Sequence, residues 1–161
     1  AFMHKHKEYG YDLYTIPFYE GRGGAAEPLL GASRNGKSNY FAKYSPDSRW
    51  IVFCQSKSYL FLQPDSRLYI VPAGGGEARE MRCNLNGMNS WHSWSPNSRW
   101  LVFACNAFSP YTQLFITHID AQGNSTPPVA LPHLTAPEWA INVPEFMPRA
   151  ATAIERITLK F

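Results

Sequence analysis

The sequence predicts an all-β protein, and three observations support that prediction. A ten-residue phrase occurs twice: residues 44–53 read YSPDSRWIVF and residues 94–103 read WSPNSRWLVF. Both copies end in aromatic and β-branched residues, which are enriched in strands. Pro, with 13 residues, and Gly, with 11, are spread along the chain, as expected for short strands joined by turns. No segment combines a sustained 3.6-residue apolar period with helix caps.

Each copy of the phrase indicates a strand, a tight turn and a second strand. Pro46 and Pro96 preset φ at the first central turn position, and Asp or Asn after proline tolerates the turn and can bond its own backbone. Ser45 and Ser95 lie 50 residues apart. A repeat at this spacing is the sequence signature of a repeat architecture.

Two further segments recur with the phrase. A leucine followed by an aromatic residue opens a strand at residues 13–14, 68–69 and 114–115. A turn containing glycine follows each of them, and a short strand comes next, at residues 27–30, 78–81 and 128–131. Four antiparallel strands in each period of about 40 to 50 residues are typical of a β-propeller blade.

This pattern divides the chain into a partial blade at residues 1–31, which lacks its first strand, and whole blades at residues 38–83 and 89–134. Residues 135–161 form a C-terminal tail, in which residues 156–161 are a candidate ring-closing strand. A closed propeller has about four to eight blades. We therefore expect either a C-terminal fragment of a longer protein or chains that associate to complete the ring.

Composition and charge exclude several classes of function. Hydrophobic residues make up 45% and charged residues 17% of the 161 residues, which is typical of a globular protein. The net charge is +3 and the basic residues are dispersed, so no nucleic-acid surface is predicted. No apolar run approaches the length of a membrane span.

The three cysteines, Cys54, Cys83 and Cys105, form no CxxC or CxxCH motif, so neither a zinc knuckle nor attached haem is predicted. They are interpreted as small buried side chains. One disulfide with one cysteine left over is the alternative, and the spacing does not choose the pair.

The quoted repeats resemble those of the TolB-like propeller family, whose WD40-like motif contains Ser-Pro-Asp-Gly, over residues 10–134. Ser48 and Ser98 stand where that family usually has Gly, and Asn97 replaces Asp. The resemblance implies a periplasmic or exported bacterial propeller that binds a protein and has no chemistry and no cofactor of its own. It supplies no catalytic position to carry over.

Two places are candidate partner-binding sites. Trp91 and His92 lie on a predicted inner strand, where strict alternation places His92 and Trp94 on one face and Trp91 and Ser93 on the other. His92 is then either a hydrogen-bonded core residue between blades or part of a site at the central channel. Tyr59 and Phe61 lie in an insert, residues 56–66, that lengthens the second blade.

A third pattern is interpreted as a chance match. Residues 31–38, GASRNGKS, fit the P-loop pattern, with Gly31, Gly36, Lys37 and Ser38 at its defined positions. A phosphate cradle also needs a helix that starts at the lysine, whereas a strand is predicted here. His4 and His6 share a strand face without an assignable third ligand, so no metal site is predicted.

These observations favour a non-catalytic propeller module that binds another protein or an envelope component. The alternative is an accessory propeller of a larger exported enzyme, either a peptidase or a redox complex. Propellers of this kind also occur as gating domains of prolyl-oligopeptidase-type peptidases. No GxSxG nucleophile elbow occurs in the sequence, so such an enzyme would have its catalytic domain outside these residues.

Overall fold

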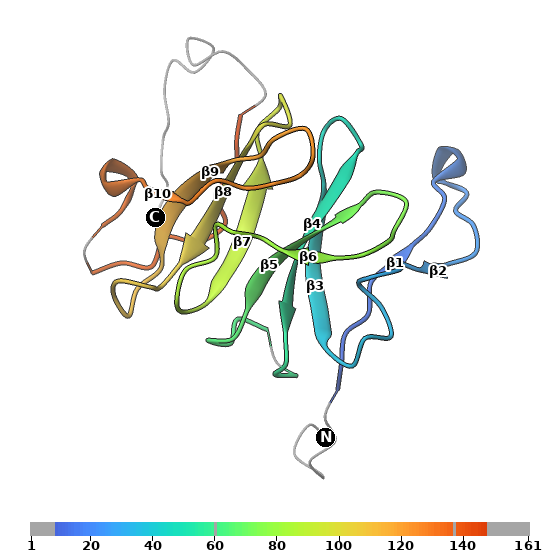
Figure 1. The fold of residues 1–161 in the computed structure, drawn as a ribbon, viewed down its shortest axis with the longest axis horizontal. Coiled ribbons are helices and arrows are strands. Elements are labelled where there is room, and N and C mark those ends of the chain that lie inside the picture. The colour runs from blue at the N-terminus through green and yellow to red at the C-terminus, as the bar shows by residue number, and fades with distance from the viewer. Residues whose placement is uncertain (1–8, 60, 137, 148–161) are drawn as a thin grey trace.

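The structure is a computed structural model that describes residues 9–59, 61–136 and 138–147. The described chain is all-β, as the sequence predicts, with two short 3-10 helices and no α-helix in these ranges. Three antiparallel sheets follow one another across the molecule in chain order (Figure 1). The predicted strand at residues 156–161, and His4 and His6, lie outside the described residues.

The first sheet pairs β1 (Tyr14–Thr15) with β2 (Glu27–Pro28). The second has the order β3-β4-β5-β6 and the third the order β7-β8-β9-β10. The strands of the second sheet are β3 (Ser38–Tyr44), β4 (Trp50–Ser56), β5 (Arg67–Pro72) and β6 (Arg79–Glu80). Those of the third are β7 (Asn89–Trp94), β8 (Trp100–Cys105), β9 (Gln113–His118) and β10 (Val129–Ala130). The 3-10 helices are η1 (Tyr19–Gly21) and η2 (Pro132–Leu134).

The two Ser-Pro turns have one hydrogen-bond pattern. The Ser45 hydroxyl donates to Asp47 Oδ1 at 2.6 Å and accepts the Trp50 N–H at 3.0 Å. In the second turn the matching distances, from Ser95 to Asn97 and from Trp100 to Ser95, are 2.7 and 2.9 Å. The turns also touch each other, because the Asp47 N–H donates to the Ser98 hydroxyl at 2.9 Å.

The core lies between the sheets and consists of two clusters of buried side chains, and β4 contributes residues to both. Ile51 and Phe53 pack with residues of the first sheet region in one cluster, whereas Val52 and Cys54 pack toward the third sheet in the other. This division follows the two-residue period of a strand, which sends successive side chains to opposite faces. The larger cluster joins β4 and β5 to β8 and β9, through residues such as Phe103. Each sheet therefore buries its apolar face against the next.

The predicted alternation along β7 holds for His92 and Trp94, which both hydrogen-bond carbonyls of the second sheet, Val52 and Lys43, whereas Ser93 bonds Glu145 of the tail. The strand is not regular throughout, because the pairing register of β7 with β8 shifts between Ser90 and Ser93, and Trp91 adopts a φ of 44°. This β-bulge adds one residue to β7. The same shift occurs in β3, between Tyr40 and Lys43.

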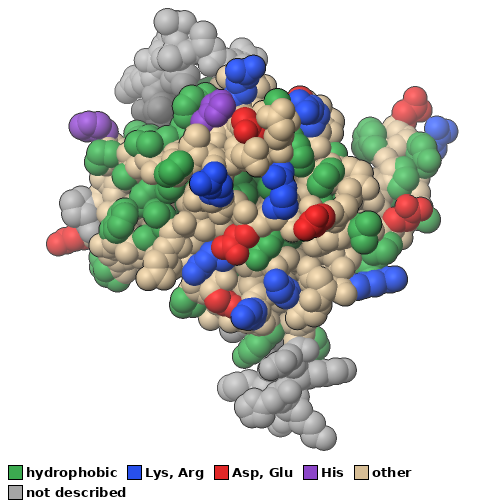
Figure 2. All heavy atoms as spheres, in the orientation of Figure 1, with side chains coloured by type: hydrophobic (Ala, Val, Ile, Leu, Met, Phe, Trp, Pro, Cys, Tyr) green, Lys and Arg blue, Asp and Glu red, His purple; other side chains and the backbone are tan. Residues whose placement is uncertain are grey.

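Cys54, Cys83 and Cys105 are free and buried. The interpretation as buried thiols is therefore confirmed, and the disulfide alternative is wrong. Within the described ranges, no helix is long and apolar enough to cross a membrane. On the face that Figure 2 shows, basic side chains are interspersed with acidic ones rather than gathered in a stripe.

Candidate functional site

The bulges of the inner strands bound a small cavity. Phe41 on β3 and Trp91 on β7 occupy the same repeat position, and each is the residue at which φ is positive, at 56° and 44°. Together with Val143 they line a cavity of about 180 Å³, whose remaining walls are Ala42, Lys43 and His92. Left-handed backbone at bulky residues is uncommon, and strained residues of this kind cluster at functional sites. We therefore treat this place, the axial site, as the candidate functional site.

A polar network lies beside the axial site. Lys43 Nζ forms an ion pair with the carboxylate of Glu145, and the Ser93 hydroxyl donates to Glu145 Oε2 at 2.6 Å. The hydrogen bonds from Lys43 and Ser93 lower the pKa of Glu145 below its ordinary value, so the carboxylate is charged at neutral pH. Trp94 Nε1 donates to the Lys43 carbonyl at 3.2 Å and ties β7 to β3.

His92 forms one wall of the cavity, yet its side chain is packed between sheets and only 1% exposed. Nε2 lies 3.0 Å from the Val52 carbonyl oxygen. A carbonyl only accepts hydrogen bonds, so Nε2 carries the proton and donates. Burial lowers the pKa of His92 to about 4, so the ring is neutral at neutral pH.

The Cys54 thiol lies 3.9 Å from His92 Nδ1, which resembles a nucleophile and base pair in composition. Burial raises the pKa of Cys54 to about 12, and it lowers that of His92. A reactive cysteine needs a depressed pKa and access to substrate. The two groups are therefore a neutral packing pair between β4 and β7.

The four predicted binding residues fall into two groups. Trp91 and His92 come together at the axial site, whereas Tyr59 and Phe61 lie in the loop between β4 and β5. Tyr59 is 48% exposed, and Phe61 belongs to an aromatic cluster with ring centroids 4.4 Å from Tyr11, 4.8 Å from Tyr40 and 5.4 Å from Phe41. Phe41 therefore connects the cluster to the axial site.

Sequence reasoning missed Phe41, Lys43, Val143 and Glu145. The signal for the first two was the 50-residue offset, which pairs Phe41 with Trp91 and Lys43 with Ser93. For Val143 and Glu145 in the tail, the matching signal was Pro148, which stands five and three residues after them, as Pro46 does after Phe41 and Lys43.

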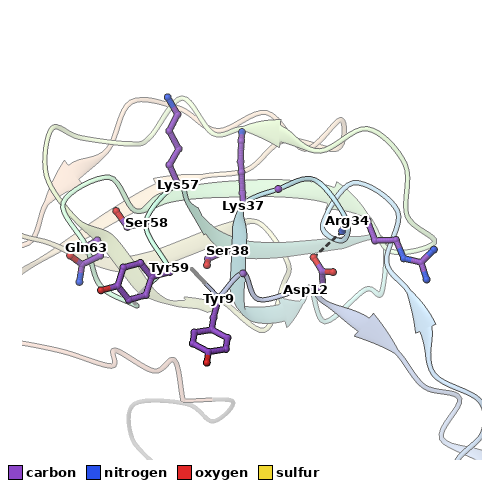
Figure 3. Close-up of a pocket in the computed structure, with 11 residues that line it drawn as sticks. Tyr9, Asp12, Arg34, Lys37, Ser38, Lys57, Ser58, Tyr59 and Gln63 are labelled. Atoms are coloured by element: carbon purple, nitrogen blue, oxygen red, sulfur yellow. Dashed lines mark hydrogen bonds between the residues drawn. The ribbon is translucent and has the colours of Figure 1, made fainter. Parts of the chain in front are cut away.

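A larger hollow of about 620 Å³ lies between the loops of the first two sheets (Figure 3). Its lining includes Tyr9, Tyr59 and Lys57, and also Gly36, Lys37 and Ser38 of the P-loop-like stretch. Lys37 and Lys57 point away from the two tyrosines in Figure 3. Lys37 Nζ instead donates to Gln55 Oε1 at 2.8 Å and lies 5.6 Å from the centroid of the Tyr69 ring.

The P-loop-like stretch has a structural role. β3 begins at Ser38 directly after Lys37, so the helix that a phosphate cradle requires does not follow. Gly31 has a φ of 92°, and a Cβ there would lie 2.2 Å from the Gly76 carbonyl oxygen. The glycine thus allows a close approach between two backbone segments. Among the described residues, no group of three His, Cys, Asp or Glu side chains could hold a metal ion.

Comparison with known proteins supports the propeller fold. No family model and no curated protein matches the chain. The crystal structure of puromycin hydrolase matches 74% of this chain with a TM-score of 0.52 and 18% identity. A mutant of puromycin hydrolase complexed with PGG matches the same share, with a TM-score of 0.51 and 17% identity.

The chain spans 20% of the length of the hydrolase that it matches. At this identity the likeness concerns the fold alone. The chain folds as β-propeller blades of four antiparallel strands. The resemblance to the TolB-like family gains support from these comparisons only at the level of the propeller fold.

Proposed function

We propose that this chain is an accessory propeller segment of a larger exported hydrolase of the peptidase kind. The observation that carries the proposal is the match to puromycin hydrolase over 74% of this chain and 20% of the hydrolase. The match favours the accessory-propeller alternative over a free-standing binding module.

The side chains of the axial site fit a role in access rather than in bond cleavage. The Cys54–His92 pair is buried and neutral, so it supplies no nucleophile. Phe41 and Trp91 instead present large apolar surfaces beside the charged Lys43–Glu145 pair. Under the proposal, the propeller selects which peptides reach a catalytic domain, and the bond-breaking residues lie outside this segment.

The test uses the full-length protein isolated from its source. Its intact mass is compared with the 18.2 kDa of this chain, and it is assayed with chromogenic peptide amides and a covalent serine-hydrolase probe. We expect a larger mass, probe labelling and amide hydrolysis. A full-length protein of 18.2 kDa that neither labels nor hydrolyses would exclude the proposal.

Variants separate access from chemistry. Trp91→Ala should change the ratio of kcat/KM between long and short peptides by about tenfold, which corresponds to about 1.4 kcal/mol, without changing probe labelling. Trp100→Ala is the matched control, because Trp100 opens β8 and its ring packs on His118 instead of lining the axial site. Equal effects of the two variants would refute the access role.

A second candidate function, binding of a protein partner in the cell envelope, is favoured by the exposed rings of Tyr9 and Tyr59 at the larger hollow. Exposed aromatic residues are enriched where proteins bind each other. Fractionation of source cells tests the envelope location. Loss of co-purification in Tyr59→Ala, with Tyr44→Ala as the exposed control, tests the surface.

A further inference from the structure

Residues 141–147 follow the path of an inner strand. The same backbone hydrogen bond marks the start of this path and of the two inner strands. In each case the N–H of the first residue donates to a carbonyl oxygen that lies two residues before the leucine of a Leu-aromatic pair, Leu13, Leu68 or Leu114. These hydrogen bonds join Asn39 N to Tyr11 O at 2.7 Å, Asn89 N to Ser66 O at 3.1 Å, and Ile141 N to Thr112 O at 3.0 Å. Ile141 therefore occupies the position that Asn39 holds in β3 and Asn89 holds in β7.

The same backbone irregularity follows two residues later in all three units. The residues concerned and their φ angles are Phe41 at 56°, Trp91 at 44° and Val143 at 53°. Left-handed backbone is unfavourable for bulky residues and most of all for a β-branched one. Its recurrence at one position indicates a shared bulge rather than three unrelated local distortions.

Side chains four residues after each start meet at the axial site. They are Lys43 on β3, Ser93 on β7 and Glu145 on the tail. Glu145 binds both of the others, through the ion pair with Lys43 and the 2.6 Å hydrogen bond from Ser93. Equivalent positions of adjacent propeller blades face one axis, so this meeting places Glu145 where a fourth inner strand would put it.

The path made by residues 141–147 has an open edge. β3 pairs with β4 and β7 pairs with β8, whereas in the described ranges no strand is paired with residues 141–147. Hydrophobic side chains are exposed on the left of Figure 2, where β8–β10 lie. In the chain from the end of β8 to the tail, the exposed hydrophobic residues include Phe108, Val129, Leu134 and Trp139.

We propose that residues 141–147 are the inner strand of a fourth blade. The sequence supports this assignment, because Pro148 stands seven residues after Ile141, as Pro46 and Pro96 stand seven after Asn39 and Asn89.

Hydrogen exchange in the full chain tests the pairing. The backbone amides of residues 142–147 should be protected to a degree comparable with β3 and β7, because strand amides exchange only when the pairing opens.

Peptides from β8 and β9 report whether the remaining fold is intact in each variant. Unprotected amides at residues 142–147 in the unsubstituted chain would overturn the proposal.

A charge-exchange cycle independently tests the position of residues 141–147, through the ion pair between Lys43 and Glu145. Lys43→Glu and Glu145→Lys should each increase exchange of residues 142–147, and the double variant should restore protection, because only neighbouring charges couple. Glu138→Lys, a reversal at an exposed site, is the control. Additive effects of the two single variants would contradict the proposed placement of Glu145.

Discussion

Acidification from pH 6.5 toward pH 4 should destabilise this fold through one side chain, His92. The ring is 1% exposed, and its Nε2 donates to the Val52 carbonyl oxygen. Burial removes the water that would solvate a charged ring, and this lowers the pKa of His92 from 6.5 to about 4. In the unfolded chain the ring regains its ordinary pKa. The unfolded state therefore takes up a proton at a higher pH than the folded state does.

The sign and the size of the effect follow from this difference. The contribution of His92 to stability is fully present above pH 6.5 and is lost as the pH falls toward the folded pKa of about 4. The loss approaches about 1.4 kcal/mol per pH unit, and it totals about 3 kcal/mol over the whole window.

Two carboxylates whose pKa is lowered titrate in a different range. Asp47 is stabilised in its charged form chiefly by the Ser45 hydroxyl, and Glu145 by Lys43 and Ser93, so the pKa of each lies below its ordinary value of 3.8 or 4.5. Their contributions are therefore lost only as the pH falls below about 4.5. The interval between pH 6.5 and 4.5 thus isolates His92 from these two groups.

The assay is urea unfolding, followed by tryptophan fluorescence, at several pH values between 7.5 and 4.5. His92→Gln is the comparison, because an amide can still donate to Val52 but does not titrate. The free energy of unfolding of the unsubstituted chain should fall by about 2 to 3 kcal/mol between pH 6.5 and 4.5, and that of the variant should change much less. Equal losses in the two proteins, or an imidazole NMR titration of His92 near pH 6.5, would refute the reasoning.

Three further predictions concern backbone and thiols. In urea unfolding, Gly31→Ala should lower the free energy of unfolding by more than about 2 kcal/mol, because the new Cβ would lie 2.2 Å from the Gly76 oxygen. Gly36→Ala should lower it by about 1 kcal/mol, because nothing lies within 4 Å of that Cβ. Equal losses in the two variants would contradict the close approach at Gly31. Ser48→Gly, at a φ of 58°, should stabilise by up to about 1 kcal/mol, and Ser98→Gly should gain less, because Ser98 also accepts the Asp47 N–H. Burial raises the pKa of Cys54 and of Cys83 to about 12 and also raises that of Cys105, so Ellman's reagent should label these thiols in urea but not in the folded protein; rapid labelling of the folded protein would contradict their burial.

The blades could be predicted because their signals are local. A serine hydroxyl that closes the turn onto the following tryptophan N–H needs only the residues between Ser45 and Trp50, and Ser95 and Trp100 repeat the arrangement. Strand propensity and turn chemistry then predict the same strand–turn–strand element, so the repeat can be recognised without tertiary information.

The bulges could not be predicted in the same way. Phe41 and Trp91 follow Tyr40 and Ser90, and no turn residue marks either place. Two residues before each bulge, a backbone N–H bonds a carbonyl of the preceding unit, and this contact recurs in the tail, where Ile141 replaces the asparagine. The asparagine side chains of the other two units add further bonds to backbone carbonyls. Asn39 Nδ2 donates to Tyr11 O and Lys37 O, and Asn89 Nδ2 donates to Ser66 O and Gly87 O. A tertiary contact of this kind has no periodicity to detect.

In the tail, the backbone geometry of the inner strands is kept although residues that mark those strands in the sequence are replaced. Ile141 replaces the asparagine and Met147 replaces the serine of Ser-Pro, so Pro148 is the one of these signals that remains there. The hydrogen bond of Ile141 N and the φ of Val143 nevertheless repeat those of β3 and β7. A shared bulge fixes where the fifth residue of each path points, while leaving its chemistry free. The axis therefore holds a cation, a hydroxyl and a carboxylate at Lys43, Ser93 and Glu145, and differences among propellers of this kind should concentrate at these positions rather than in the turns.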